Sequence, residues 1–397
     1  MTSHSPSADV RHAARRWRNG IFAIFFIAGL ALSSWLSRVP RIRDDLGATA
    51  SHMGLLMFTL GIGSVIGLSS SSHLITRFGA RPTIRVSLWV LALGMAVAAL
   101  GLAGPVAPVV VVGLFVAGLG MGTCDVAMNF SGAACERDLG RTVMPLFHAL
   151  FSLGTVLGAA LGALAATLDI GVAPHVLTVA VLVAAGSLAT VRIPVQERAV
   201  ADPDAPALTW RDRLAVWTTP STWLIGLVVL GMALTEGSAN DWLSLAMVDG
   251  RGFTEAQGAT MLGVFLVAMT AGRVVGTPLV DRFGRVRTVL ATAIIAAVGL
   301  SMVLFIPTTP TAVIGAVLWG LGASLGFPLG MSAAAEDPES GAARLGAVST
   351  LGYLAFLVFP PALGFLGDRV GVLDALLLVL VLIIAAAIAS PALRERR

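Results

Sequence analysis

Long apolar segments recur from one end of the sequence to the other, and they restrict the fold more than any other feature. Examples are Ile21 to Leu36, Val106 to Val126 and Ala375 to Ser390. Each approaches or reaches the roughly 20 apolar residues that a helix needs to cross a bilayer. Only 12% of the residues are Asp, Glu, Lys or Arg, about half the share in an ordinary soluble domain. The sequence therefore predicts an integral membrane protein with many spans.

Turn-forming and charged residues divide these segments into twelve predicted helices. The Ala-, Leu-, Gly- and Val-rich runs far exceed the roughly ten alternating residues of a membrane β-strand, so we expect an all-α polytopic chain. The predicted spans are 18–38, 51–76, 82–103, 106–134, 142–168, 173–193, 220–246, 255–280, 287–306, 310–334, 342–367 and 371–393.

The arginines predict the orientation of these spans. All 26 basic residues are arginine, and cytoplasmic segments of membrane proteins are enriched in Arg and Lys. If the N-terminus is cytoplasmic, twenty arginines lie on the cytoplasmic side and five on the other, at positions 38, 41, 43, 251 and 369. We therefore expect both termini in the cytoplasm. The absence of lysine and the Ala-rich composition indicate a GC-rich bacterial gene, so we expect the chain in a bacterial inner membrane. The high pI reflects this asymmetry, and we expect no nucleic-acid partner.

The chain contains an internal repeat. Three motifs of the first half recur in the same order in the second: WLS at 35–37 and 242–244, TRFGARPT at 76–83 as DRFGRVRT at 281–288, and GLG at 118–120 and 320–322. Two parallel six-helix halves of this kind are typical of secondary transporters. We predict two pseudo-symmetric six-helix bundles, 1–193 and 220–397, joined by a cytoplasmic linker at 194–219.

Glycines spaced four residues apart predict faces for close helix contact. Small residues let the backbones of membrane helices approach each other. Such faces occur at Gly118 and Gly122, and at Gly154, Gly158 and Gly162.

The predicted span 220–246 carries unusual polar residues. A carboxylate at the centre of a membrane helix costs about 2.5–3.5 kcal/mol, so it usually faces a cavity or a partner. Glu236, Asn240 and Ser244 form one stripe, whereas Asp241 points roughly 140° away from Glu236. We predict that Glu236 and Asn240 face a central cavity. Asp241 is either a further site residue or a helix-end carboxylate.

The span 106–134 repeats this pattern, with Asp125 and Asn129 four residues apart. A hairpin turn near Asp138 would bring Asn129 level with His148 on the next span. His148 is either part of the same polar site or a core histidine with its hydrogen bonds satisfied.

Arg273 lies too deep in its span to reach the membrane surface easily. It either clamps an anionic substrate or pairs with Glu236 or Asp125. Three acids against one arginine leave two negative charges uncompensated. Low dielectric disfavours a charged carboxylate, so we expect at least one acid to bind a proton part of the time. Proton coupling requires this chemistry.

The motif DRFGRVRT resembles the loop signature of the major facilitator superfamily, and helix number, repeat and central loop extend the resemblance over essentially the whole chain. In that family the Asp caps or pairs across the cytoplasmic gate. The resemblance implies a gating role for the matching residues: Asp281, Arg282, Gly284 and Arg285. The first-half copy departs from the signature, with Thr76 in place of the Asp and Ala80 in place of an Arg.

Four further motifs are similar to a bacterial branch near the fucose permeases, which are sugar–proton symporters: DVAMN at 125–129, FHALFSLG at 147–154, EGSANDW at 236–242 and AGRVVG at 271–276. The coupling acids of those permeases lie in the first and fourth helices. Asp125 matches the fourth-helix acid. The first helix here has no carboxylate, so sugar specificity does not carry over.

These features predict a secondary transporter that moves a small solute by alternating access, coupled to protons as a symporter. The alternatives are proton-driven efflux of drugs or metabolites, and a non-transporting sensor on the same scaffold. An enzyme is not expected, because GxSG, HExxH and paired aspartyl motifs are absent from the sequence. Cys124 and Cys135 support neither a disulfide framework nor a metal site. We expect no cofactor or metal, and a monomer whose partners are solute, protons and lipid.

Overall fold

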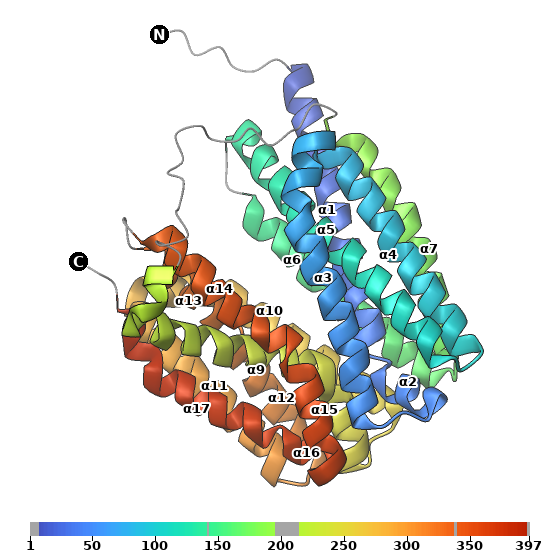
Figure 1. The fold of residues 1–397 in the computed structure, drawn as a ribbon, viewed down its shortest axis with the longest axis vertical. Coiled ribbons are helices and arrows are strands. Elements are labelled where there is room, and N and C mark those ends of the chain that lie inside the picture. Colours follow the sequence, from blue (N-terminus) through green and yellow to red (C-terminus); the bar gives the residue numbers. More distant parts are fainter. Residues whose placement is uncertain (1–7, 141–142, 195–213, 337–339, 395–397) are drawn as a thin grey trace. The chain divides into compact units, whose positions relative to one another are not determined.

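The computed structural model describes residues 8–140, 143–194, 214–336 and 340–394 (Figure 1). Regular structure within these ranges is helical, and they contain no β-strand. Twelve helical segments in them are long and apolar enough to cross a membrane, and they coincide with the predicted spans to within a few residues. The prediction of an all-α polytopic membrane protein is therefore confirmed.

The chain divides into two compact units. The first holds the described residues of Met1–Arg38 and Thr59–Asp202, and the second those of Val39–Phe58 and Pro203–Arg397. Most of the predicted linker 194–219 lies outside the described residues. The segment Val39–Phe58 was expected in the first bundle by sequence, but it packs with the second unit.

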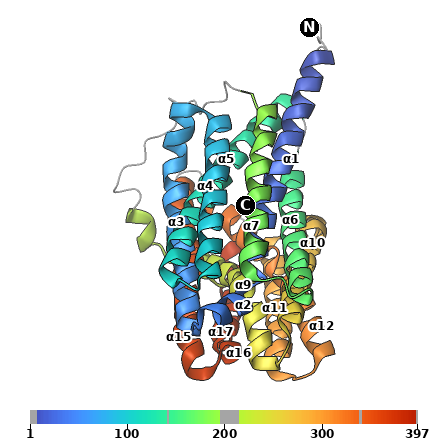
Figure 2. The same cartoon turned by 90° about the vertical axis from the view of Figure 1, so that its right-hand side faces the viewer.

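Long helices form the first unit (Figures 1 and 2). They are α1 (Ala8–Leu36), α3 (Ala50–Phe78) from Thr59 onward, α4 (Ala80–Ala103), α5 (Ala107–Leu139), α6 (Met144–Thr167) and α7 (Val172–Gly186), the last extended by a 3-10 turn (Ser187–Arg192). Helix α4 packs along α5, and α1 packs along α6.

The second unit is built around α9, which contacts α10, α13, α14 and α17. Its helices are α2 (Val39–Leu46), α9 (Pro220–Arg251), α10 (Glu255–Phe283), α11 (Arg285–Phe305), α12 (Thr309–Ala323), α13 (Gly326–Ala335), α14 (Gly341–Leu357), α15 (Phe359–Val370), α16 (Val372–Ala375) and α17 (Leu377–Ala389). Short 3-10 turns (Val216–Thr218 and Ser390–Leu393) precede α9 and follow α17.

The predicted glycine faces are helix contacts. A methyl group on Gly154 would collide with the backbone oxygen of Phe26 on α1, and one on Gly158 would lie 2.6 Å from the backbone oxygen of Leu30. On α5, a methyl group on Gly118 or Gly122 would collide with the backbone of α3. These glycines therefore allow the backbones to touch, as the sequence predicts.

Substitution of Gly154 with leucine tests this packing. The obstructing atom belongs to the backbone and cannot rotate away. We therefore expect the free energy of unfolding to fall by about 1–3 kcal/mol or more, and the thermal transition to fall by several degrees. Gly104→Leu is the control, because the nearest atom to its added carbon is 3.6 Å away. Fluorescence-detected size exclusion after heating measures both variants. Equal midpoints for the two variants would contradict the proposed contact.

The internal repeat is also visible in backbone geometry. Gly79 joins α3 to α4 with φ 89° and ψ 164°, and Gly284 joins α10 to α11 with φ 78° and ψ 162°. A positive φ favours glycine because it has no Cβ. The hydroxyl of Thr83 donates to the Gly79 oxygen at 2.7 Å, and that of Thr288 donates to the Gly284 oxygen at 2.9 Å. The two sequence copies thus build the same turn.

Candidate functional site

Glu236 and Arg273 form an ion pair between α9 and α10. Nη2 of Arg273 donates to both carboxylate oxygens of Glu236, at 3.0 Å and 2.9 Å. The side chains are 20% exposed for Glu236 and 37% for Arg273. The sequence left Glu236 and Asp125 as alternative ion-pair partners of Arg273, and in the structure the partner is Glu236. The pair is electrically neutral and remains accessible to a ligand.

The other polar residues of α9 continue from this pair. Asn240 lies one turn beyond Glu236 and is half-buried, as is Asp241. Ser244, one turn further, is buried, and its hydroxyl has no hydrogen-bond partner among the described residues. Asp241 makes neither an ion pair nor a hydrogen bond within the described part of the chain. Helix α9 therefore offers hydrogen-bonding groups beside a balanced charge pair.

Asp125 and Asn129 form a separate polar site in the first unit. Both lie on α5, where Asp125 is exposed and Asn129 is half-buried. The Asn129 amide donates to the backbone oxygen of Asp125 at 2.8 Å and to its Oδ1 at 3.3 Å. An amide orients the carboxylate without neutralising it. Among the described residues, no cation pairs with Asp125.

His148 belongs to an aromatic cluster between α1 and α6. Its exposed ring meets Phe25 edge-on, with ring centres 5.3 Å apart. Phe25 also stacks on Phe147, and Phe147 packs on Phe22 with centres 5.0 Å apart. The hydrogen bonds of Asn129 go to Asp125 and not to His148.

The residues predicted to gate lie where α10 ends and α11 begins. Asp281 and Arg282 are exposed, and the Arg282 guanidinium lies 5.3 Å from the centre of the Phe283 ring. Arg285 is buried, and its Nη2 donates to Oε2 of Glu336 at 2.9 Å. This carboxylate neutralises the arginine at the start of α11.

Glu336 was not among the predicted site residues. It follows α13 in the segment EDPESGA, and its first-half counterpart by spacing is Glu136, at an offset of 336 − 136 = 200. Glu136 instead accepts hydrogen bonds from the backbone nitrogens of Val143 and Met144, at 2.6 Å and 2.7 Å. A carboxylate at a helix start is favourable because unpaired amides and the helix dipole meet there. The first half has Ala80 in place of Arg285. Glu136 therefore accepts hydrogen bonds from the backbone, where Glu336 instead pairs with an arginine.

A second polar cluster in the second unit involves the segment around α2. Arg43 pairs with Asp249 at the end of α9 and with Asp44, and the Ser51 hydroxyl and amide donate to Asp368 on α15. Partial burial alone would lower the pKa of Arg43, but the two carboxylates outweigh it and raise that pKa above its ordinary value. Sequence spacing contains no signal for the contacts of Arg43 with Asp249 and of Ser51 with Asp368, because each pair is more than 200 residues apart.

Comparison with known proteins identifies relatives along nearly the full length of the chain. The family model described as Major Facilitator Superfamily matches residues 21–344. An uncharacterized MFS-type transporter of Yersinia pestis is 31% identical over 348 residues, covering 87% of each chain. An uncharacterized transporter of Sinorhizobium fredii is 31% identical over 90% of this chain and 93% of its own. The membrane protein MosC of Rhizobium meliloti is 26% identical over 92% and 87%.

Solved transporter structures share the fold. The nucleoside transporter NupG superposes with a TM-score of 0.73 at 14% identity, covering 96% of this chain and all of its own. The E. coli fucose:proton symporter FucP gives 0.65 at 16% identity, over 96% and 98%. At such identities the likeness concerns the fold alone.

Proposed function

The chain belongs to the Major Facilitator Superfamily and transports a solute across a membrane rather than catalysing a reaction, and from this premise we propose that it is a proton-coupled symporter of a small polar molecule working by alternating access. The observation that carries the proposal is which of the membrane carboxylates is paired with a cation. Glu236 is balanced by Arg273, whereas Asp125 lies midway along α5 with no cation paired to it among the described residues. Such a charge is costly in a membrane helix, and binding a proton removes the cost.

Asp125 is therefore our candidate for the coupling acid, and Asp241 is the second. Asn129 holds the Asp125 carboxylate in position, and its amide can donate to the charged form or accept a hydrogen bond from the protonated form. Glu236 has a different role, because Arg273 already balances its charge. The sequence left open which of the three acids carries the proton, and we propose Asp125 rather than Glu236.

The polar face of α9 and α10 is our candidate for solute recognition. Arg273 supplies donors, Glu236 supplies acceptors and Asn240 supplies both. This set suits a solute with hydroxyl, amide or carboxylate groups better than an apolar drug. Helix α6 also lacks the interior Gly-Pro pair that drug-efflux members of the family usually carry, which weakens the case for efflux. That FucP is a fucose:proton symporter on the same fold gives further support.

We also propose a location and a gate. Both termini would be cytoplasmic, which the arginine asymmetry supports, and the protein would be a monomer in a bacterial inner membrane. The segment from Asp281 to Arg285 then lies at the cytoplasmic end of α10, where Asp281, Arg282, Gly284 and the Arg285–Glu336 pair control opening. His148, which is exposed and rests on Phe25, is our further candidate for solute or proton contact in the first unit.

A two-stage experiment tests this function. Purified protein is screened for thermal stabilisation by sugars, nucleosides, amino acids and organic acids, and each hit is tested for uptake into proteoliposomes with an alkaline interior. We expect accumulation that collapses when a protonophore is added, with empty liposomes as the control. Accumulation that resists the protonophore would disprove proton coupling. A stabilising ligand that never crosses the membrane would indicate a sensor instead.

A further inference from the structure

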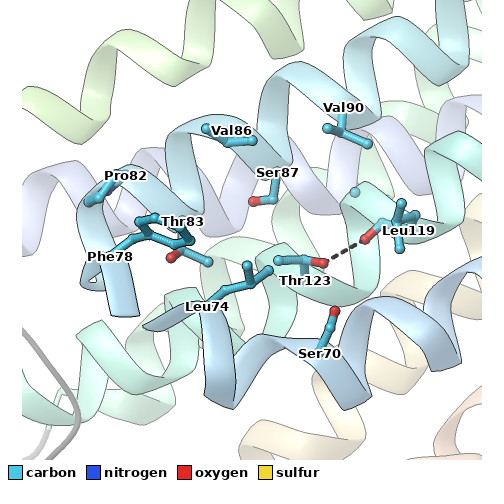
Figure 3. Close-up of a pocket in the computed structure, with 11 residues that line it drawn as sticks. Ser70, Leu74, Phe78, Pro82, Thr83, Val86, Ser87, Val90, Leu119 and Thr123 are labelled. Carbon is cyan, nitrogen blue, oxygen red and sulfur yellow. Dashed lines mark hydrogen bonds between the residues drawn. The ribbon is translucent and has the colours of Figure 1, made fainter. Parts of the chain in front are cut away.

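A cavity of about 560 Å³ lies within the first unit, between α3, α4 and α5, apart from the polar residues described above (Figure 3). Its volume is within the usual range of small-molecule sites, about 300–1,000 Å³. Leu74 and Phe78 of α3 line one side, Val86 and Val90 of α4 the other, and Leu119 of α5 the base. No titratable side chain lines it.

The hydroxyl groups in the wall are occupied by their own helices. Thr123 donates to the Leu119 oxygen at 2.9 Å, the dashed bond in Figure 3. Ser70 donates to the Gly67 oxygen at 3.1 Å and Ser87 to the Ile84 oxygen at 2.9 Å. With these hydrogens engaged, the wall presents mainly carbon to an occupant. The cavity therefore suits a hydrocarbon rather than a polar solute.

The cavity borders an exposed apolar face of α4. Val86 is 60% exposed, and Trp89 and Leu93 on the same face are 55% and 59% exposed. In a membrane-spanning helix, such a face meets lipid, whose acyl chains fill the space that water fills around a soluble protein. Val86 belongs both to this face and to the cavity wall, so a chain from the bilayer can reach the cavity without crossing polar surface.

Positive charge marks one end of the cavity. Phe78 and Pro82 line the wall beside the turn between α3 and α4, and each directly follows an arginine, Arg77 and Arg81. The Arg77 guanidinium lies 5.3 Å from the centre of the Phe78 ring, and neither α3 nor α4 contains an acidic residue. The second-half copy of this turn carries Asp281 where the first has Thr76, so only the first-half turn lacks an acid that would repel a phosphate.

We propose that this cavity binds one acyl chain of an anionic phospholipid, whose phosphate contacts Arg77 and Arg81. Each basic residue near a membrane surface contributes about 1 kcal/mol to the attraction of anionic lipid. Packing of the acyl chain against the apolar cavity wall adds to this attraction. In the predicted orientation the lipid belongs to the cytoplasmic leaflet. The site is independent of the proposed solute and proton residues.

Native mass spectrometry of the protein released from nanodiscs tests the proposal, with phosphatidylglycerol as the probe and phosphatidylcholine as the neutral reference. We expect one phosphatidylglycerol retained per protein and at least fivefold less phosphatidylcholine. Val90→Phe fills the cavity, so we expect it to reduce retention at least fivefold. Leu93→Phe adds a similar bulk on the same face outside the wall, and we expect retention to be unchanged. Equal retention by the two variants would overturn the cavity assignment.

The headgroup contact is tested separately. The double variant Arg77→Gln/Arg81→Gln should bind the two lipids equally, whereas Arg282→Gln/Arg287→Gln, with the same loss of charge at the second-half turn, should keep the preference. If both double variants lose the preference for phosphatidylglycerol, the preference depends on net charge alone, and the proposed contact of the phosphate with Arg77 and Arg81 is wrong. If Val90→Phe is not monodisperse in size exclusion, Val86→Phe replaces it, because Val86 lines the same cavity.

Discussion

Replacing Arg273 with alanine is expected to abolish transport and to destabilise the protein. The change leaves Glu236, only 20% exposed, without its cation. Removing one partner of a fully buried ion pair lowers the free energy of unfolding by about 3–5 kcal/mol. Because Arg273 is partly exposed, we expect a loss of roughly 2 kcal/mol here. Arg287→Ala is the control, because Arg287 is exposed and lies in the first turn of a different helix, α11.

The double variant Glu236→Gln/Arg273→Gln separates stability from function. With both charges of the pair removed, neither residue leaves an unpaired charge behind, so we expect the thermal midpoint to return close to that of the unmodified protein. Solute binding should remain lost, since two of the three groups of the proposed recognition face have changed. A double-mutant cycle on thermal midpoint, with Glu236→Gln and Arg273→Gln as the single variants, gives the coupling between the two residues. Additive effects of the single variants would show that the pair does not act as a unit.

Asp125→Asn is expected to uncouple solute movement from protons. The amide resembles the protonated acid and cannot release a proton, so solute exchange should continue while accumulation stops. A pH gradient of one unit is worth about 1.4 kcal/mol per proton, or about tenfold accumulation with one proton per solute. We expect this ratio to fall to unity, measured as radiolabelled uptake and counterflow in proteoliposomes.

Three parallel variants sharpen this result. Asp138→Asn removes an exposed acid at the end of the same helix and should leave accumulation intact. Asp241→Asn tests the second candidate, and Glu236→Gln should impair binding and exchange together, because it breaks the pair with Arg273. If Asp125→Asn and Asp241→Asn both still accumulate solute along a pH gradient, neither carboxylate carries the coupling proton.

The sequence by itself determined the twelve spans, the repeat and the glycine contacts. Hydropathy predicts the spans because a backbone in lipid must satisfy its hydrogen bonds within each segment. A long apolar segment in a membrane therefore forms a helix. Gly79 and Gly284 were recognisable as equivalent because both occupy the same place in the repeated motif, and glycine suits the positive φ of both turns. Gly154 and Gly118 were recognisable as contacts because only small residues permit backbone approach.

Only the tertiary structure decided which charges meet. Helical periodicity aligned Glu236 with Asn240, but it could not choose a partner for Arg273, which lies 37 residues away on another helix. It also gave no indication of the Arg285–Glu336 pair, the contacts of Arg43 and Ser51, or the lipid-facing cavity beside Val90. The physical reason is that periodicity describes one helix at a time. The neighbours and rotation of each helix depend on side-chain packing among all of them, and the pairing of charges follows from that packing.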